Sequence, residues 1–161
     1  MLIGAPGAGK TRIGKRIARR LEVPFIDTDK RIVAEHGPIA EIFAAHGESR
    51  FRQIEREHVQ RALGERAVVA LGGGAVLDAD TQRDLADAVV VQLSVTAEAV
   101  AARITGDKRP LVSGVDAWTA LVATRRPIYD RLSDRTFDTS SLPLDAIAAD
   151  VVSWLQETTH D

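Results

Sequence analysis

Short apolar runs alternate with segments of helical periodicity along most of this 161-residue chain. The apolar runs are bounded by turn residues, which predicts strands at 1–3, 24–27, 67–71, 88–94 and 135–138. Between them apolar positions recur every three or four residues, which predicts helices at 10–21, 30–36, 38–45, 48–63, 78–86, 96–104, 116–132 and 143–157. Strands that alternate with helices favour an α/β fold, a mostly parallel sheet with helices on both faces.

A sheet of this kind binds its ligands beyond the carboxyl ends of its strands. We therefore expect the loops after 1–3, 24–27 and 67–71 to share one edge that carries the functional residues. One further stretch, TGDKRPLVSGVD at 105–116, holds two glycines, a proline and several charges between two predicted helices. Loops with this composition often close over an active site, so we predict a lid there.

The loop after the first strand reads GAPGAGKT, and it fits the phosphate-loop pattern G-x-x-x-x-G-K-[ST] at residues 4–11. Gly4, Gly7 and Gly9 would let backbone N–H groups reach phosphate oxygens, and the following helix would add the positive end of its dipole. Lys10 would contact the β- and γ-phosphates, and the Thr11 hydroxyl would ligate Mg²⁺. The alternative is a glycine-rich turn at the start of a surface helix.

Two carboxylates follow the second predicted strand, in the sequence Asp27-Thr28-Asp29. One of them could hold Mg²⁺ through water, while the other could accept hydrogen bonds from a substrate hydroxyl. The alternative is that Asp29 is only the N-cap of a helix that starts at Lys30. Beside a phosphate loop we favour the functional interpretation.

Two segments further along the chain offer groups that suit a ligand site. Arg52 could fork onto a carboxylate while Glu55 holds it, or it could be a surface residue paired with Glu48. The LGGGAV segment at 71–76 follows the third strand, where bare backbone would let a ligand approach closely, although a plain loop is the alternative.

Two more arginines are Arg109 in KRPL and Arg125 in RRPIY, and an arginine on a closing loop could neutralise the charge of a transferring phosphate. Taken singly, each is better interpreted as a solvated side chain. Pro127, between Arg125 and the end of that predicted helix, is expected to bend the helix or start it.

The composition, 45% hydrophobic and 27% charged, is ordinary for a globular protein, and the length suits a single domain, 1–161. A net charge of −2 gives no overall basic field that would attract nucleic acid or a membrane. The absence of cysteine excludes disulfides, thiol catalysis and zinc–thiolate sites. No signal peptide or membrane-length apolar run is present, so we expect a cytoplasmic protein. The four histidines show no close metal-ligand spacing, so surface or hydrogen-bonded roles are predicted for His36, His46, His58 and His160.

Taken together, the motifs resemble the shikimate kinase family. GAPGAGKT, DTD, IAEIFAAHGESRFRQIE, LGGGAV, RPL and RxPIY occur in the order and approximate spacing of that family, over nearly the whole chain. The resemblance implies a P-loop fold like that of nucleoside monophosphate kinases, with a five-stranded parallel sheet in a three-layer α/β/α arrangement, a lid and substrate-binding helices at about 30–63. It also implies that ATP, with Mg²⁺, phosphorylates the 3-hydroxyl of shikimate on the route to chorismate and aromatic amino acids.

The resemblance also implies roles for individual residues. Shikimate would be bound by Asp29, Arg52, Gly73 and Arg125, with Phe43 and Phe51 near its pocket. ATP phosphates would be bound by Gly7, Ala8, Gly9, Lys10, Thr11 and Arg109. Mg²⁺ would be held by Thr11 and, through water, by Asp27. The catalytic groups would be Lys10, Asp29 and Arg109, and we expect a monomer.

Two other functions stay open at this point, a P-loop kinase of another polyol acid such as gluconate, and a paralogue that binds ATP without turnover. The first predicted strand is unusually short, because only Met1, Leu2 and Ile3 precede Gly4. A charged amino terminus at the end of a buried strand is costly, so we expect it to fray or to turn towards solvent. We also expect the natural chain to begin several residues earlier.

Overall fold

The computed structural model describes residues 1–106, 114–141 and 143–159. In this part of the chain the strands form one sheet in the order β2-β3-β1-β4-β5, with every neighbouring pair parallel. Their bounds are Leu2–Gly4 (β1), Phe25–Asp27 (β2), Val68–Ala70 (β3), Val91–Ser94 (β4) and Arg135–Asp138 (β5). The predicted α/β class with five parallel strands is thereby confirmed.

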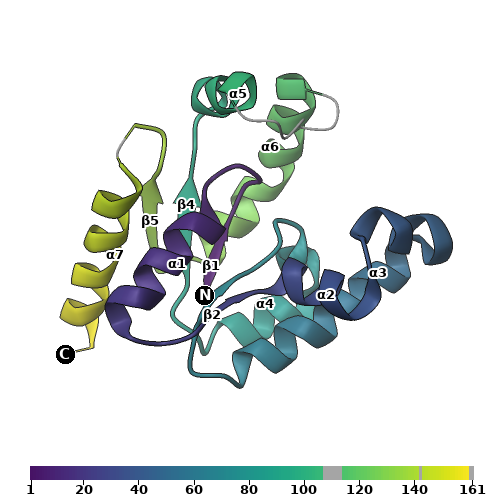
Figure 1. Ribbon diagram of the computed structural model, residues 1–161, viewed down its shortest axis with the longest axis horizontal. Coiled ribbons are helices and arrows are strands. Elements are labelled where there is room, and N and C mark those ends of the chain that lie inside the picture. Colours follow the sequence, from purple (N-terminus) through teal and green to yellow (C-terminus); the bar gives the residue numbers. More distant parts are fainter. Residues whose placement is uncertain (107–113, 142, 160–161) are drawn as a thin grey trace.

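Helices lie on both faces of this sheet (Figure 1). Helices α1 and α7 pack together on one face, and α3, α4 and α6 contribute to the core on the other. Their bounds, with one 3₁₀ turn, are Lys10–Leu21 (α1), Thr28–His36 (α2), Ile39–Leu63 (α3), Ala75–Leu77 (η1), Ala79–Leu85 (α4), Ala97–Gly106 (α5), Gly114–Leu132 (α6) and Leu144–Thr158 (α7). No helix in the described ranges has the length and apolar character needed to span a membrane.

The central strand β1 is buried on both faces because its successive side chains enter different cores. Leu2 belongs to the cluster formed with α1 and α7, and Ile3 belongs to the cluster on the opposite face. The first cluster includes Ile13, Ile17, Leu93, Ile147 and Val151. The second includes Ile26, Val59, Val69, Leu85 and Tyr129. This arrangement holds the phosphate loop at the end of a rigid strand.

Helices α2 and α3 form an arm beside the sheet with a small core of its own (Figure 1). That core consists of Ile32, Ile42, Phe51 and Ile54. The backbone of α3 breaks at Gly47, where φ is 80° and ψ is 171°. Glycine accepts this conformation without the strain that a side chain would cause. The break agrees with the two helices predicted at 38–45 and 48–63.

Several predicted helix boundaries were wrong, for identifiable local reasons. Helix α2 begins at Thr28 rather than Lys30, because the Asp27 side chain accepts a hydrogen bond from the Lys30 N–H at 3.1 Å and caps the helix. Asp29 is therefore a residue of the first turn and not the N-cap. Pro127 lies inside α6, which neither starts nor ends there.

The predicted lid lies mostly outside the described residues. Helix α5 extends to Gly106 and α6 already begins at Gly114, so both ends of the range 105–116 are helical rather than loop. Residues 107–113, which include Arg109, are not described. The lid and the role of Arg109 accordingly stay predictions from the sequence.

The amino terminus does not fray as expected. The Met1 amino group donates a hydrogen bond of 2.7 Å to the carbonyl of Val89, which precedes β4. Burial lowers the pKa of this amino group to about 6, and the charge of Asp134 opposes that shift. Fraying is avoided because the neighbouring segment of the chain supplies a hydrogen-bond acceptor, although this hydrogen bond lies at an exposed position.

Candidate active site

The phosphate loop connects β1 to α1 through backbone that requires glycine. A Cβ on Gly4, where φ is 144°, would lie 2.2 Å from the carbonyl oxygen of Leu93 on the adjacent strand. Gly9, the N-cap of α1, is left-handed with a φ of 88°. Among the described residues no side chain caps α1, and its first turn has no acidic residue. The amides at the start of α1 are therefore available to an anion.

The Lys10 ammonium lies across this loop. It donates hydrogen bonds to the carbonyl oxygens of Gly4 at 2.7 Å and Ala5 at 3.0 Å. Burial lowers the pKa of Lys10 to about 8, and the carboxylates of Asp29 and Asp27 act in the opposite direction. Among the described residues this partly buried cation has only carbonyl partners, so it gains most from an anion that enters the loop, such as a phosphate.

Thr11 and Asp27 place two hard oxygen donors side by side. The Thr11 hydroxyl donates to Asp27 Oδ2 at 2.7 Å, while Asp27 Oδ1 caps α2. Hydroxyl and carboxylate oxygens are the ligands that Mg²⁺ prefers, and Mg²⁺ keeps several waters in such sites. The donor set therefore fits the ion that the sequence predicted for these two residues.

Asp29 lies at the inner end of α2, against the loop that follows β3. Between the two aspartates, Thr28 is fully buried and accepts a hydrogen bond of 3.3 Å from the N–H of Gly72. Burial raises the pKa of Asp29, and Asp27 acts in the same direction, whereas Lys10 and Arg52 oppose the shift. Asp29 is thus a carboxylate of increased basicity that faces two cations.

The three consecutive glycines after β3 each face a charged side chain of the site. A Cβ on Gly72 would lie 2.6 Å from Asp29 Oδ1, and one on Gly74 would lie 2.5 Å from Arg52 Nη1. A Cβ on Gly73 would lie 3.2 Å from Arg125 Nη1. The segment therefore gathers groups from β2–α2, α3 and α6 around bare backbone. The sequence alone predicts only that a ligand can approach the backbone of this segment closely.

Arg52 forms an ion pair with Glu55, a carboxylate that is almost fully buried. Its Nη1 donates to Glu55 Oε1 at 2.8 Å, and Glu55 is only 4% exposed. A second carboxylate, Glu48, lies 3.5 Å from Nη2. Burial raises the pKa of Glu55, and Arg52 opposes this shift. Both partners considered from the sequence are thus present, and the Glu55 contact orients the guanidinium towards Gly74.

Phe51 and Phe43 border the same arm. Phe51 is buried, while Phe43 is partly exposed, and their rings lie 4.9 Å apart. The Arg52 guanidinium lies 5.4 Å from the centre of the Phe51 ring. The pair gives the arm an apolar surface next to the charged groups.

Tyr129 is a site residue that the sequence reasoning missed. Its side chain is 1% exposed, and its hydroxyl donates a 2.7 Å hydrogen bond to the carbonyl of Gly73. Burial raises the pKa of Tyr129, and the neighbouring Arg125 acts in the opposite direction. The available signal was spacing, because Tyr129 follows Arg125 by one helical turn and shares its face of α6. Tyr129 thus links the glycine segment to the helix that carries Arg125.

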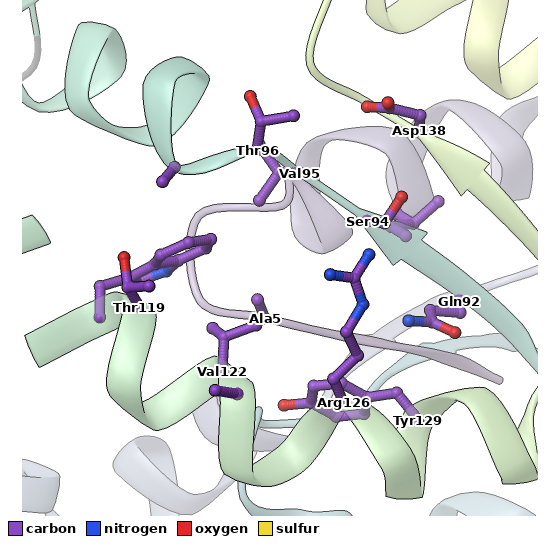
Figure 2. A pocket seen from close by; sticks show the side chains of 14 residues that line it. Ala5, Gln92, Ser94, Val95, Thr96, Thr119, Val122, Arg126, Tyr129 and Asp138 are labelled. Carbon is purple, nitrogen blue, oxygen red and sulfur yellow. The ribbon is translucent and has the colours of Figure 1, made fainter. Parts of the chain in front are cut away.

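A separate cavity of about 360 Å³ lies behind the phosphate loop, between β4 and α6. Figure 2 shows the Arg126 side chain rising from α6 into this cavity, towards Ser94. Asp29, Arg52 and Arg125 do not line it. The adjacent arginines of the RRP segment therefore face different places, Arg125 the glycine segment and Arg126 this cavity.

Comparison with known proteins places this geometry in a family. The family model described as SKI, shikimate kinase, matches residues 6–156. A shikimate kinase of Mycobacterium avium (strain 104) is 43% identical over 164 residues, which cover 98% of this chain and 93% of that protein. A shikimate kinase of Symbiobacterium thermophilum is 39% identical over 166 residues, with coverage of 98% and 95%.

Solved structures also show similarity to shikimate kinases. A shikimate kinase from Acinetobacter baumannii in complex with shikimate has a TM-score of 0.89 and 30% identity, and the match covers 98% of this chain and 92% of that one. A gluconokinase from Sinorhizobium meliloti 1021, with a TM-score of 0.59 and 19% identity, shares the fold alone. With a family model over most of its length and relatives of this similarity, the chain belongs to the shikimate kinase family.

Proposed function

We propose that this chain transfers the γ-phosphoryl group of ATP to the 3-hydroxyl of shikimate, giving shikimate 3-phosphate and ADP for the synthesis of chorismate and aromatic amino acids. The observation that carries the proposal is the convergence of Asp29, Arg52 and Arg125 on three bare glycines, directly beside the phosphate loop. Membership of the shikimate kinase family supports the same substrate pair.

Shikimate is a small carboxylate with several hydroxyls, and each charged group of the site suits one part of it. The guanidinium groups of Arg52 and Arg125 would fork onto the carboxylate, because two donors on one plane match two carboxylate oxygens. Gly73 would leave room for the ring to lie against the backbone. Asp29 would accept a hydrogen bond from the hydroxyl that attacks the phosphate.

In the proposed reaction the 3-hydroxyl oxygen forms a bond to the γ-phosphorus while the bond from that phosphorus to the bridging oxygen breaks. The electron pair of the broken bond leaves with ADP, and the hydroxyl proton passes to Asp29 Oδ1 or Oδ2. The raised pKa of Asp29 suits this step, since a more basic carboxylate is a better proton acceptor.

The other groups would stabilise charge during the transfer. Lys10 and the amides at the start of α1 would bind phosphate oxygens, and Arg109 is proposed to do the same on the strength of the sequence alone. Thr11, with Asp27 through water, would hold Mg²⁺, which neutralises charge that develops on the phosphates. Positioning and charge stabilisation are the main requirements of phosphoryl transfer.

The test is ADP release with shikimate, with gluconate and with neither. We expect release that depends on shikimate and is not supported by gluconate. Release with gluconate alone would assign the site to another polyol acid, and no release above the rate without acceptor would identify a paralogue that binds ATP only. A single domain, a monomeric state and a cytoplasmic location stay predictions from the sequence, and light scattering of the purified protein would test the second.

Replacement of Tyr129 by phenylalanine is expected to weaken shikimate binding with little change in kcat. The substitution removes only the hydroxyl that fixes the Gly73 carbonyl, and one hydrogen bond of this kind contributes about 0.5–1.5 kcal/mol. The KM for shikimate should therefore rise by about two- to tenfold while the KM for ATP stays unchanged. An equal rise in both constants would indicate a general loss of structure instead.

Replacement of Gly72 by alanine is expected to lower kcat by about tenfold, because small misplacement of a reacting group is costly. The new methyl group would push the Asp29 carboxylate out of place, since the added carbon would lie 2.6 Å from Oδ1. Gly64→Ala is the matched control, because Gly64 has ordinary helical dihedral angles and lies outside the site. Unchanged kcat in Gly72→Ala, measured by coupled ADP release, would argue against a role for Asp29 in the reaction.

A further inference from the structure

Three side chains that can bind metals meet where the end of α2 contacts α3. Glu35 and His36 are the last two residues of α2, and His58 lies on α3. One ligand atom from each lies within 4.8 Å of the others. The proposed reaction uses none of the three. The two histidines show no close spacing along the chain, because they come from two different helices.

The distances fit the edge lengths of a tetrahedral site. Glu35 Oε2 lies 3.3 Å from His58 Nε2 and 3.8 Å from His36 Nε2. Ligands in a tetrahedral zinc site with bonds of about 2.0–2.2 Å are roughly 3.3–3.6 Å apart. The Glu35–His58 edge therefore already has this length. His36 is exposed at the end of its helix, so rotation of its side chain can shorten the other two edges.

Arg61 is the side chain that would compete with a metal ion for Glu35 and His58. Its guanidinium is bidentate on Glu35, with distances of 3.1 Å and 2.9 Å. Its Nη2 also lies 3.0 Å from Nε2 and 3.3 Å from Nδ1 of His58. The lone-pair directions of the two ring nitrogens diverge in the ring plane, so one atom can approach both this closely only above the ring face. Arg61 therefore leaves the in-plane lone pair of His58 available.

The cationic side chains around the cluster can make room for an ion. The Arg61 side chain is 55% exposed, so its head can turn into solvent or keep only Glu35 Oε1. Arg31, the other arginine nearby, is bidentate on Glu65 at 2.6 Å and 3.1 Å. Arg31 is therefore paired with Glu65 and does not compete with a metal ion for Glu35. A divalent ion between Glu35 and the two imidazoles thus displaces the contacts of one side chain, Arg61, which is mostly exposed.

We propose that Glu35, His36 and His58 bind a divalent cation of the zinc class, with water in the fourth position. Two imidazoles and one carboxylate suit Zn²⁺, whereas Mg²⁺ and Ca²⁺ prefer oxygen ligands throughout. Because the ligands come from α2 and α3, the ion fastens the end of α2 to α3. The same two helices carry Asp29 and Arg52, so the ion stabilises the arm that presents them. The inference does not depend on the proposed kinase activity.

The test is Zn²⁺ binding by the full-length protein, freed of metal with a chelator and kept without nucleotide, measured by equilibrium dialysis with metal analysis. We expect one Zn²⁺ per chain in the wild type. Glu35→Gln and His36→Ala should each weaken binding by about tenfold or more, as losses in a metal's shell do. Both positions are exposed, so the variants should fold. His46→Ala is the matched control, because His46 is an exposed histidine of α3 outside the cluster.

Three further readouts decide the result. Co²⁺ in place of Zn²⁺ should show the visible bands of a tetrahedral site in the wild type and in His46→Ala, but not in His36→Ala. Zn²⁺ should raise the melting temperature of the same two proteins, since it binds only the folded state. Excess Mg²⁺ should not displace it. Absence of bound zinc, equal affinity in all variants, or displacement by Mg²⁺, which would place the ion at Thr11 and Asp27, would each overturn the proposal.

Discussion

Replacement of Lys10 by methionine is expected to remove nearly all turnover and leave the fold intact. The ammonium lies across the phosphate loop, where its only hydrogen-bond partners among the described residues are the carbonyls of Gly4 and Ala5. Loss of one charged donor that stabilises the transition state typically costs about a hundred- to a thousandfold in kcat. Methionine keeps the apolar stem and removes a charge whose burial opposes folding, so the melting temperature should not fall.

Lys15→Met is the matched control, because Lys15 lies exposed on the same helix. It should retain wild-type kcat. The two variants and the wild type are compared by coupled ADP release and by thermal melting. If Lys10→Met kept more than about a tenth of wild-type kcat, the charge stabilisation assigned to Lys10 would be wrong. A large fall in its melting temperature alone would instead assign Lys10 a structural role.

The phosphate loop was predictable because its parts are contiguous in the sequence. Gly4, Gly9, Lys10 and Thr11 lie close together between a strand and a helix, so their spacing alone predicts a phosphate loop. The parallel sheet was predictable for a similar reason, since each strand–helix unit is local. The expectation that DTD and GGG share one edge also held, because β2 and β3 are neighbours in the sheet.

What each glycine of the GGG segment faces could not be predicted. Gly72, Gly73 and Gly74 contact groups that arrive from three different elements, and only the packing of α3 and α6 decides which group meets which glycine. For the same reason the role of Tyr129 could not be predicted, because its partner is a carbonyl in that segment. The cluster of Glu35, His36 and His58 could not be predicted either, because the proximity of these residues depends on the contact between two helices.

Replacement of Arg52 or Arg125 by lysine is the second large effect that we expect, and it should be specific to shikimate. Lysine keeps the positive charge but cannot fork onto a carboxylate. Hydrogen bonds to charged groups contribute about 1.5–3 kcal/mol, so each variant should raise the KM for shikimate by about ten- to a hundredfold. The KM for ATP should change by less than about twofold, since neither guanidinium belongs to the phosphate loop.

Arg126, the residue next to Arg125, provides a closely matched control for Arg125→Lys. Arg126→Lys changes the next residue of the same helix, but its side chain enters the cavity behind the phosphate loop, so both KM values should stay at the wild-type level. Separate titrations of shikimate and ATP at saturating partner give the constants. If Arg126→Lys matched Arg125→Lys, the effect would come from α6 as a whole. If Arg52→Lys raised both constants equally, the pair with buried Glu55 would be structural, and shikimate would bind without Arg52.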